Sequence, residues 1–339
     1  MAKPETEKKE IKSTPVEPPL SSDGEGEKHT DEVVLPILGI RLPRAILPWL
    51  IIALFAALLL GWSFLTSLPP MWFDDEGYYS HGILVPFMAL AVIYMRREQI
   101  RKQPIGSSWL GFAVMIIGLG MVLEGRSIGN MSISGFGFIL SLIGGVYFAF
   151  GKHIGRICLA PFLFLVFMMP FLGYIIDLTT NRLQIMSTVV ASKMLSLVGF
   201  QNMIPDGFPT LILMDHYELN IGGPCSGFKL ILSLTAFTTF FVMISSLGLW
   251  RDIFLFAITI PLALLINGLR IMLIGIVGEF GTINPGAWWA VKMREWGKNS
   301  DVGLVFHDYS GYITLIVCFI ILHYIVKLLE RRPSVAPAS

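Results

Sequence analysis

The sequence predicts an all-α, polytopic integral membrane protein with about eight transmembrane helices. Of its 339 residues, 54% are hydrophobic and only 14% are charged, and the mean hydropathy is +0.69. This charged fraction is well below the roughly 25% of a soluble domain. Apolar segments long enough to cross ~30 Å of hydrocarbon recur along the chain. They lie at about 45–68, 82–95, 109–124, 132–150, 157–176, 225–246, 253–274 and 312–329.

Three regions follow from composition. Residues 1–40 are rich in Lys, Glu, Pro and Ser, and we expect a disordered cytoplasmic tail there. The tail has no apolar core of the kind that marks a signal peptide. Residues 41–330 form the expected transmembrane domain, and residues 331–339 a short cytoplasmic tail.

Several classes of ligand are not supported. The net charge of +1 indicates no nucleic-acid partner, and three cysteines without CxxC spacing predict neither a disulfide framework nor a metal site. Phosphate-binding glycine loops are absent, so we expect no cofactor. The glycine-rich stretch from Ser134 to Gly145 is apolar and is better explained by close helix packing.

The distribution of Lys and Arg predicts the orientation in the membrane. With eight spans, the basic clusters before the first span and after the second, fourth, sixth and eighth are all cytoplasmic, as are both termini. The loop from Pro69 to Ser80 has three acidic residues and no basic ones, as expected outside. The stretch 177–200 is either an interfacial amphipathic helix or a ninth span. A ninth span would place Arg331 and Arg332 outside, so eight is preferred.

Under this topology three chemically useful side chains reach the outer face. Cys225 opens the sixth span, Arg270 closes the seventh, and His307 lies just before the eighth. Two spans of about 22 residues joined by a short turn would place Cys225 and Arg270 at similar depth. Partial alternation in Thr210–Ile221 predicts a short outer-face hairpin before the Cys225 helix.

Each of these side chains has a functional and an ordinary interpretation. Cys225 would lie in the first turn of a helix, where free N–H groups favour a thiolate; an inert buried cysteine is the commoner case. Arg270 would bind a carboxylate or an oxyanion, or extend to the headgroups, with Asn267 on the same helix face. His307 suits proton transfer, or is a solvated loop residue. Asp308 is not expected to face it, because adjacent side chains on a helix diverge.

Four motifs together carry a family resemblance. They are Tyr79-Ser80-His81-Gly82, Pro224-Cys225-Ser226-Gly227, Asn267-Gly268-Leu269-Arg270 and His307-Asp308-Tyr309-Ser310-Gly311. In this order the chain resembles the exosortase/archaeosortase family of membrane-embedded cysteine proteases and transpeptidases. The resemblance implies Cys225 as nucleophile, His307 as general acid/base and Arg270 as the positively charged third member. Asn267, Ser226, Lys229, Tyr79 and His81 are expected to support the site or bind substrate.

The resemblance also implies substrates and a location. The family acts on secreted proteins whose C-terminal signal has a short motif such as Pro-Glu-Pro, a membrane helix and a basic cluster (the PEP-CTERM type). The expected setting is the bacterial inner membrane, with the site outside and lipids as surroundings. Arg270 or Lys229 would recognise the carboxylate of the motif. Whether water or an acceptor nucleophile completes the reaction stays open.

Two other functions remain possible at this stage. One is a non-catalytic transporter or assembly scaffold of an exopolysaccharide system, in which Cys225 only packs. The few charged residues near the middle of the spans argue against coupled transport. The other is an intramembrane protease of another type, but the HExxH helix and paired membrane aspartates of such enzymes are missing.

Overall fold

The protein is described by a computed structural model, which covers residues 32–35, 40–43, 47–74, 77–171, 173–222, 225–245, 247–297 and 301–330. Residues 1–31 of the expected N-terminal tail and residues 331–339 lie outside this part. Within the end of that expected tail, β1 (Glu32–Leu35) pairs antiparallel with β2 (Ile40–Pro43). The helices of the described part are α1 (Leu47–Trp72), η2 (Ser80–Ile83), α2 (Leu84–Met95), α3 (Arg97–Arg101), α4 (Trp109–Ser127), α5 (Met131–Phe164), η3 (Leu165–Met168), α6 (Gly173–Leu197), α7 (Phe228–Ile244), α8 (Leu249–Ile283), α9 (Trp288–Trp296) and α10 (Val302–Glu330).

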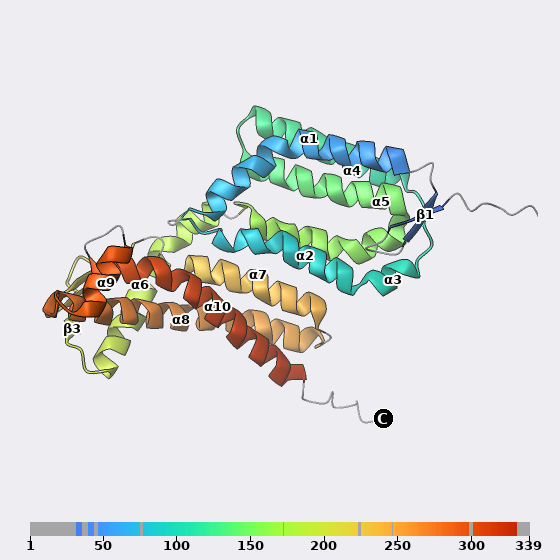
Figure 1. The fold of residues 1–339 in the computed structure, drawn as a ribbon. Coiled ribbons are helices and arrows are strands. Elements are labelled where there is room, and N and C mark those ends of the chain that lie inside the picture. The colour runs from blue at the N-terminus through green and yellow to red at the C-terminus, as the bar shows by residue number, and fades with distance from the viewer. Residues whose placement is uncertain are drawn as a thin grey trace, which may run out of the picture.

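The long helices lie roughly side by side in two groups (Figure 1). One group contains α1, α2, α4 and α5, and the other contains α7, α8 and α10. By length and composition, five segments of the described residues are able to cross a membrane: 55–72, 109–127, 131–168, 249–283 and 302–330. The segment 80–95 and α7 are apolar but shorter. The chain is therefore a mostly helical, polytopic membrane protein, as the sequence predicts.

The segment from α5 to η3 is a hairpin rather than one straight rod. Its backbone leaves the helical region at Gly151, where φ is +83°, a value that L side chains rarely adopt. Beyond this residue the chain runs back along itself, because Ser132 donates a hydrogen bond to the carbonyl of Pro170 and Gly135 lies against Met169. The predicted span 132–150 is thus the first arm of one hairpin. The second arm is shorter than the predicted span 157–176, because its helical residues end at Met168 and α6 begins at Gly173.

Glycines allow α4 and α5 to pack backbone against backbone. Gly118 of α4 lies against the backbone of Gly137 and Ser141, and Gly144 of α5 lies against the backbone of Met115. A methyl group at any of these glycines would collide with main-chain atoms of the partner helix. Without a hydrophobic driving force between helices in lipid, such close contact is a main source of association. The expectation that the glycines of 134–145 serve helix packing is confirmed.

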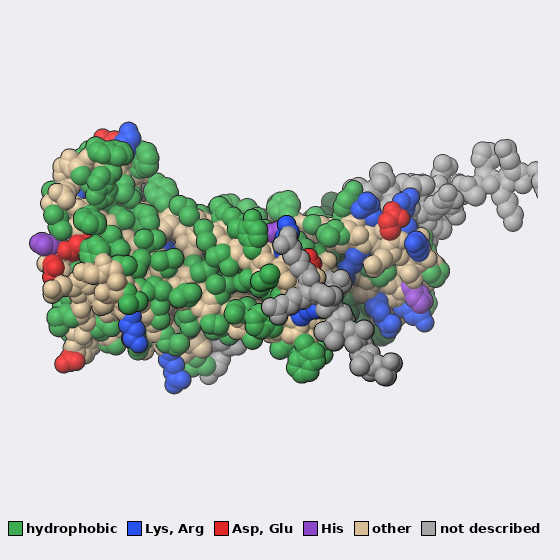
Figure 2. All heavy atoms as spheres, turned by 90° about the horizontal axis from the view of Figure 1, so that it is seen from below, with side chains coloured by type: hydrophobic (Ala, Val, Ile, Leu, Met, Phe, Trp, Pro, Cys, Tyr) green, Lys and Arg blue, Asp and Glu red, His purple; other side chains and the backbone are tan. Residues whose placement is uncertain are grey.

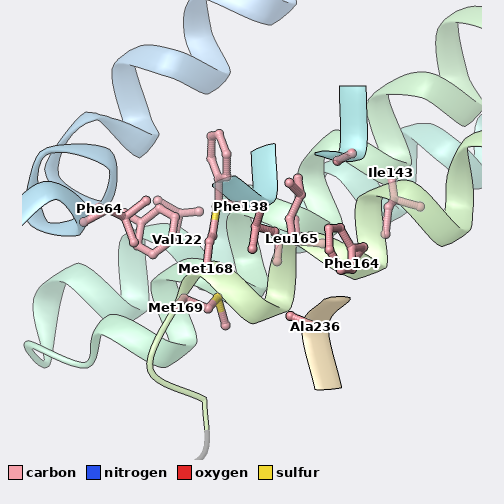
Figure 3. Close-up of a cluster of buried hydrophobic side chains, with 13 residues drawn as sticks. Phe64, Val122, Phe138, Ile143, Phe164, Leu165, Met168, Met169 and Ala236 are labelled. Carbon is pink, nitrogen blue, oxygen red and sulfur yellow. The ribbon is translucent and has the colours of Figure 1, made fainter. Parts of the chain in front are cut away.

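A purely apolar core fills the space between these helices and reaches α7. Figure 3 shows the side chains meeting between α1, α4 and the two arms of α5, with one α7 residue at the edge. The labelled members are Phe64, Val122, Phe138, Ile143, Phe164, Leu165, Met168, Met169 and Ala236. A hydrogen bond of 2.9 Å from the Trp72 indole N–H to the Met168 carbonyl fixes the end of α1 to this core.

One end of the molecule carries a cap made of three strands, α9 and the end of α8. The strands β3 (Asn202–Met203), β4 (Leu211–Met214) and β5 (Glu218–Asn220) form an antiparallel sheet in that order. The β4–β5 pair is the short hairpin that the sequence predicts before Cys225. Tyr217 of this hairpin lies against Gly278 of α8 and Gly303 of α10, and its hydroxyl donates to Asp301 at 3.2 Å.

The opposite end is basic. Figure 2 shows Lys and Arg side chains gathered at the end away from the cap, with a mainly hydrophobic belt between the two ends. At the basic end Arg96 donates hydrogen bonds to the carbonyls of Ile157 and Met243, at 3.2 and 2.9 Å, so it joins the end of α7 to α5.

Candidate active site

Cys225 lies in the linker between the β5 strand and α7. The sequence places it in the first turn of a helix, and that expectation is wrong: α7 begins at Phe228, and its N-cap is Gly227 with φ of +86°. The left-handed residue turns the chain between Cys225 and the helix, so the thiol is not part of the helical N-terminus.

The thiol of Cys225 and the imidazole of His307 are in direct contact. The distance between Sγ and Nε2 is 2.7 Å. The sequence predicts a loop at His307, and this prediction is wrong: the residue lies in the second turn of α10, which begins at Val302. The apolar run starts later than the helix because the first turns of α10 pack against the cap rather than against lipid. The structure therefore brings together two of the residues that the sequence singles out.

The electrostatic setting of Cys225 differs from that of a helix-dipole thiolate. Burial raises the pKa of the Cys225 thiol above its usual value, and the nearby positive charge of Arg270 opposes this rise. A thiol with a raised pKa is protonated at neutral pH. Burial therefore favours the neutral thiol, whose S–H is able to donate to the imidazole.

Asp308 fixes which nitrogen of His307 faces the sulfur. Its carboxylate Oδ1 lies 3.3 Å from His307 Nδ1, so the expectation that the two side chains diverge is wrong. A carboxylate only accepts hydrogen bonds, so Nδ1 carries the proton. This leaves the lone pair of Nε2 directed at Cys225.

Arg270 lies inside α8 rather than at its end. The helix continues thirteen residues further to Ile283, because this part of α8 packs within the cap. Arg270 is only 8% exposed, so it does not extend to headgroups. Its Nε donates to Ser310 Oγ and its Nη2 to the carbonyl of His307, both at 3.1 Å. Two donors of the guanidinium thus hold the turn of α10 that carries His307.

Side chains of α6 and α8 bind the main-chain carbonyls of Cys225 and Ser226. Asn267 Nδ2 donates to the carbonyl of Cys225 at 2.8 Å and to Ser187 Oγ at 3.0 Å. Ser187, from α6, donates in turn to the carbonyl of Ser226 at 3.0 Å. The Ser226 hydroxyl accepts from the N–H of Phe228 at 3.2 Å. Asn267 and Ser226 are therefore supporting residues of the Cys225 linker.

Tyr79 and His81 are buried beside the site, not in it. They are 4% and 1% exposed, and their rings stack on each other. His81 Nδ1 lies 3.0 Å from Ser233 Oγ, and Ser233 donates to the carbonyl of Lys229 at 2.7 Å. This motif thus supports the first turn of α7, and within it Ser80 lines the pocket described next.

A pocket leads to the thiol–imidazole pair between η2, α7, α8 and α10. Its lining includes the positive groups Lys229 and Arg270 and the acidic Asp308 at one wall. The remaining lining residues are Ser80, Gly227, Leu230, Asn267, His307, Gly311, Tyr312 and Leu315. The pocket lining therefore combines cationic, hydrogen-bonding and apolar side chains.

Sequence reasoning missed Ser187, Ser233 and Ser310. Ser310 belongs to the motif that contains His307 and stands three residues after it. On a helix this spacing places the two side chains on one face, which indicates that Ser310 lies near the site. Ser233 lies one helical turn after Lys229, a spacing that indicates the same helix face, whereas no spacing connects Ser187 with the site. Ser187 is recognised only when the helices are packed together.

The structure thus places a thiol–imidazole pair, beside a carboxylate and a buried guanidinium, in a polytopic helical membrane protein. The family model of the transmembrane exosortases matches residues 72–324. The chain belongs to this family. Comparisons with curated proteins and with solved structures gave no match.

Proposed function

We propose that the protein is a membrane cysteine protease or transpeptidase. It cleaves the C-terminal sorting signal of secreted proteins, of the PEP-CTERM type, at the outer face of the bacterial inner membrane. The observation that carries this proposal is the 2.7 Å contact between Cys225 Sγ and His307 Nε2. Membership of the exosortase family supports the substrate class.

The chemistry follows from the pair. His307 Nε2 accepts the thiol proton as the sulfur of Cys225 forms a bond to a peptide carbonyl carbon. The tetrahedral intermediate collapses when the carbon–nitrogen bond breaks and His307 returns the proton to the leaving amine. A thioester remains on Cys225. Water, or the amine or hydroxyl of an acceptor, then attacks this thioester with His307 as base, and the thiol is restored.

Arg270 has two roles in this scheme. Its hydrogen bonds to Ser310 and to the carbonyl of His307 hold the base in place. Its positive charge lowers the cost of forming the Cys225 thiolate. Both effects favour the charged pair that appears during attack.

The charge distribution supports the topology of the proposal. The eight spans are α1, α2, α4, the two arms of the α5 hairpin, α7, α8 and α10. The basic end is then cytoplasmic, and the cap and the Cys225 pocket face outward. A substrate helix anchored by a cytoplasmic basic cluster would present its short motif at the level of this pocket. Lys229 and Arg270 line the pocket and match an acidic residue in such a motif.

The test compares four variants at the three cysteines. A secreted reporter with a motif, membrane helix and basic cluster at its C-terminus is expressed with the protein, and removal of the tail is followed by electrophoresis. Cys225→Ala and Cys225→Ser are expected to abolish removal with the membrane level unchanged. Cys158→Ala and Cys318→Ala are the matched controls, since both side chains are buried in apolar clusters and neither lines the pocket, and they are expected to retain removal of the tail.

Full processing by Cys225→Ala would exclude the nucleophile role and return the transporter or scaffold function to consideration. The orientation is tested separately with a membrane-impermeant thiol reagent. Labelling of Cys225 from the cytoplasmic side alone would contradict the topology.

A further inference from the structure

We propose that Ser187 of α6 is a positioning residue: with Asn267 it forms a hydrogen-bonded clamp on the carbonyls of Cys225 and Ser226 that directs the Cys225 thiol at His307. The consequence for turnover rests on the function proposed above. The clamp itself is a property of the folded chain and is measurable without a substrate.

The clamped carbonyls belong to a part of the chain that no helix holds. The first main-chain hydrogen bond of α7 at this point runs from the N–H of Ile231 to the carbonyl of Gly227. The carbonyls of Cys225 and Ser226 come before it and are outside the helical ladder. Buried carbonyls need other donors, and side chains of α6 and α8 supply them.

The donors are matched one to one. The amide of Asn267 has two protons, and one goes to the Cys225 carbonyl while the other goes to Ser187 Oγ. The single proton of the Ser187 hydroxyl goes to the Ser226 carbonyl. A carbonyl oxygen cannot donate, so the amide cannot be reversed and the hydroxyl cannot rotate without losing a bond. Both side chains are at most 1% exposed, so water does not compete for these bonds.

The approach of α6 to α8 that makes the clamp possible depends on Gly268. Val190, one turn after Ser187, lies against Gly268, and a methyl group there would overlap its side chain. Val190 is β-branched and has little freedom to move aside. Enlarging Gly268 would therefore push α6 away and draw Ser187 from Asn267.

The first test is Ser187→Ala, with Thr188→Val as matched control. Thr188 is the next residue of α6, is equally buried, and its hydroxyl donates within the helix, to the carbonyl of Gln184 at 2.8 Å. We expect Ser187→Ala to lower kcat for tail removal about 10- to 100-fold, the loss typical of a displaced reacting group, with KM within about twofold. Thr188→Val is expected to keep both constants.

The second test reads the thiol directly. The rate of alkylation of Cys225 by iodoacetamide, followed by mass spectrometry on the full chain in liposomes, is measured in a double-mutant cycle. We expect His307→Ala to slow alkylation about tenfold in the wild-type background, and less than twofold in the Ser187→Ala background. A merely structural role would leave the two effects equal.

Gly268→Ala provides a variant that keeps both clamp side chains, Ser187 and Asn267. It is expected to reproduce the loss seen with Ser187→Ala, and Gly268→Ala combined with Val190→Ala is expected to recover at least part of the rate. Unchanged kcat in folded Ser187→Ala, an equal loss in Thr188→Val, or additive effects in the cycle would each overturn the clamp. If instead Cys225→Ala processes the reporter, the proposed function fails, while the alkylation cycle still decides the clamp.

Discussion

The helices from α1 to α5 meet through glycine and aromatic contacts, whereas those from α6 to α10 add buried hydroxyl, amide and guanidinium groups to apolar clusters of their own. In the first region, Gly118 and Phe138 represent contacts in which only close packing acts. In the second, Ser187, Asn267 and Arg270 are buried and hydrogen-bonded to one another or to the backbone. Both regions thus rely on close packing for helix association in lipid, and the second adds buried polar contacts. These polar contacts occur where the thiol has to be oriented.

The sharpest way to test this division is to remove His307. We expect His307→Ala to reduce tail removal by about 10²- to 10⁴-fold, the usual contribution of a general acid–base group, without a change in the amount of folded protein. His323→Ala is the control, because it lies on the same helix in contact with Phe241 and Tyr324, away from the pocket. Loss of folding in His307→Ala would show that the polar groups of this region serve mainly to stabilise the fold.

Arg270 allows its charge to be separated from its hydrogen bonds. Arg270→Lys keeps a positive charge but cannot reproduce the planar donor arrangement, and we expect about a 10²-fold loss of turnover. Arg270→Gln also removes the charge that opposes the raised pKa of Cys225. In this variant the pKa of the Cys225 thiol rises further. Alkylation of Cys225 therefore becomes fast only at a higher pH.

The pH profile distinguishes the two variants. Arg270→Lys is expected to keep a profile close to that of the wild type, and only Arg270→Gln to shift it. A downward shift in Arg270→Gln would contradict the electrostatic role, because loss of a cation cannot favour the thiolate.

The two regions also differ in how well the sequence predicts them. Apolar length and glycine content predict most of the region from α1 to α5, since α1, α2, α4 and the first arm of α5 end near the ends of their apolar runs. The second arm of α5 is the exception, because its helical residues end at Met168 and not near residue 176.

Apolar length does not predict the bounds of α8, which continues beyond Arg270, or of α10, which begins before His307. In both cases the cap supplies protein contacts in place of lipid. The structure brings together Cys225, Arg270 and His307, which the motifs single out. Ser187 has no local signal, since its partners are distant in the sequence.

For the helices α1 to α5, which pack through glycines, we expect a substitution to lower the stability of the fold and not the activity of the folded molecules. Gly118→Val places a side chain against the backbone of Ser141, and we expect a loss of about 1–3 kcal/mol from overpacking. The amount of folded protein falls, but the activity of each folded molecule stays near that of the wild type. Gly120→Val is the matched control on the same helix, because Gly120 has open space around it.

A decrease in specific activity of folded Gly118→Val would show that the two regions are coupled. The coupling would pass through Ala236 and Trp72, which join the apolar core to α7 and to the carbonyl of Met168.

The smallest effect is expected at Lys229, where charge acts on the substrate rather than on the reacting atoms. Lys229 lines the pocket and is partly exposed, so a single ion pair with a substrate carboxylate contributes roughly 1 kcal/mol, or about fivefold in KM. Lys229→Gln should raise KM for a reporter with an acidic motif and leave kcat unchanged. The same variant should make no difference to a reporter whose acidic residue is replaced by Gln. Lys292→Gln in the cap is the control, as Lys292 pairs with Glu295 away from the pocket. An equal effect of Lys229→Gln on both reporters would instead assign the lysine to the support of α7, with His81 and Ser233.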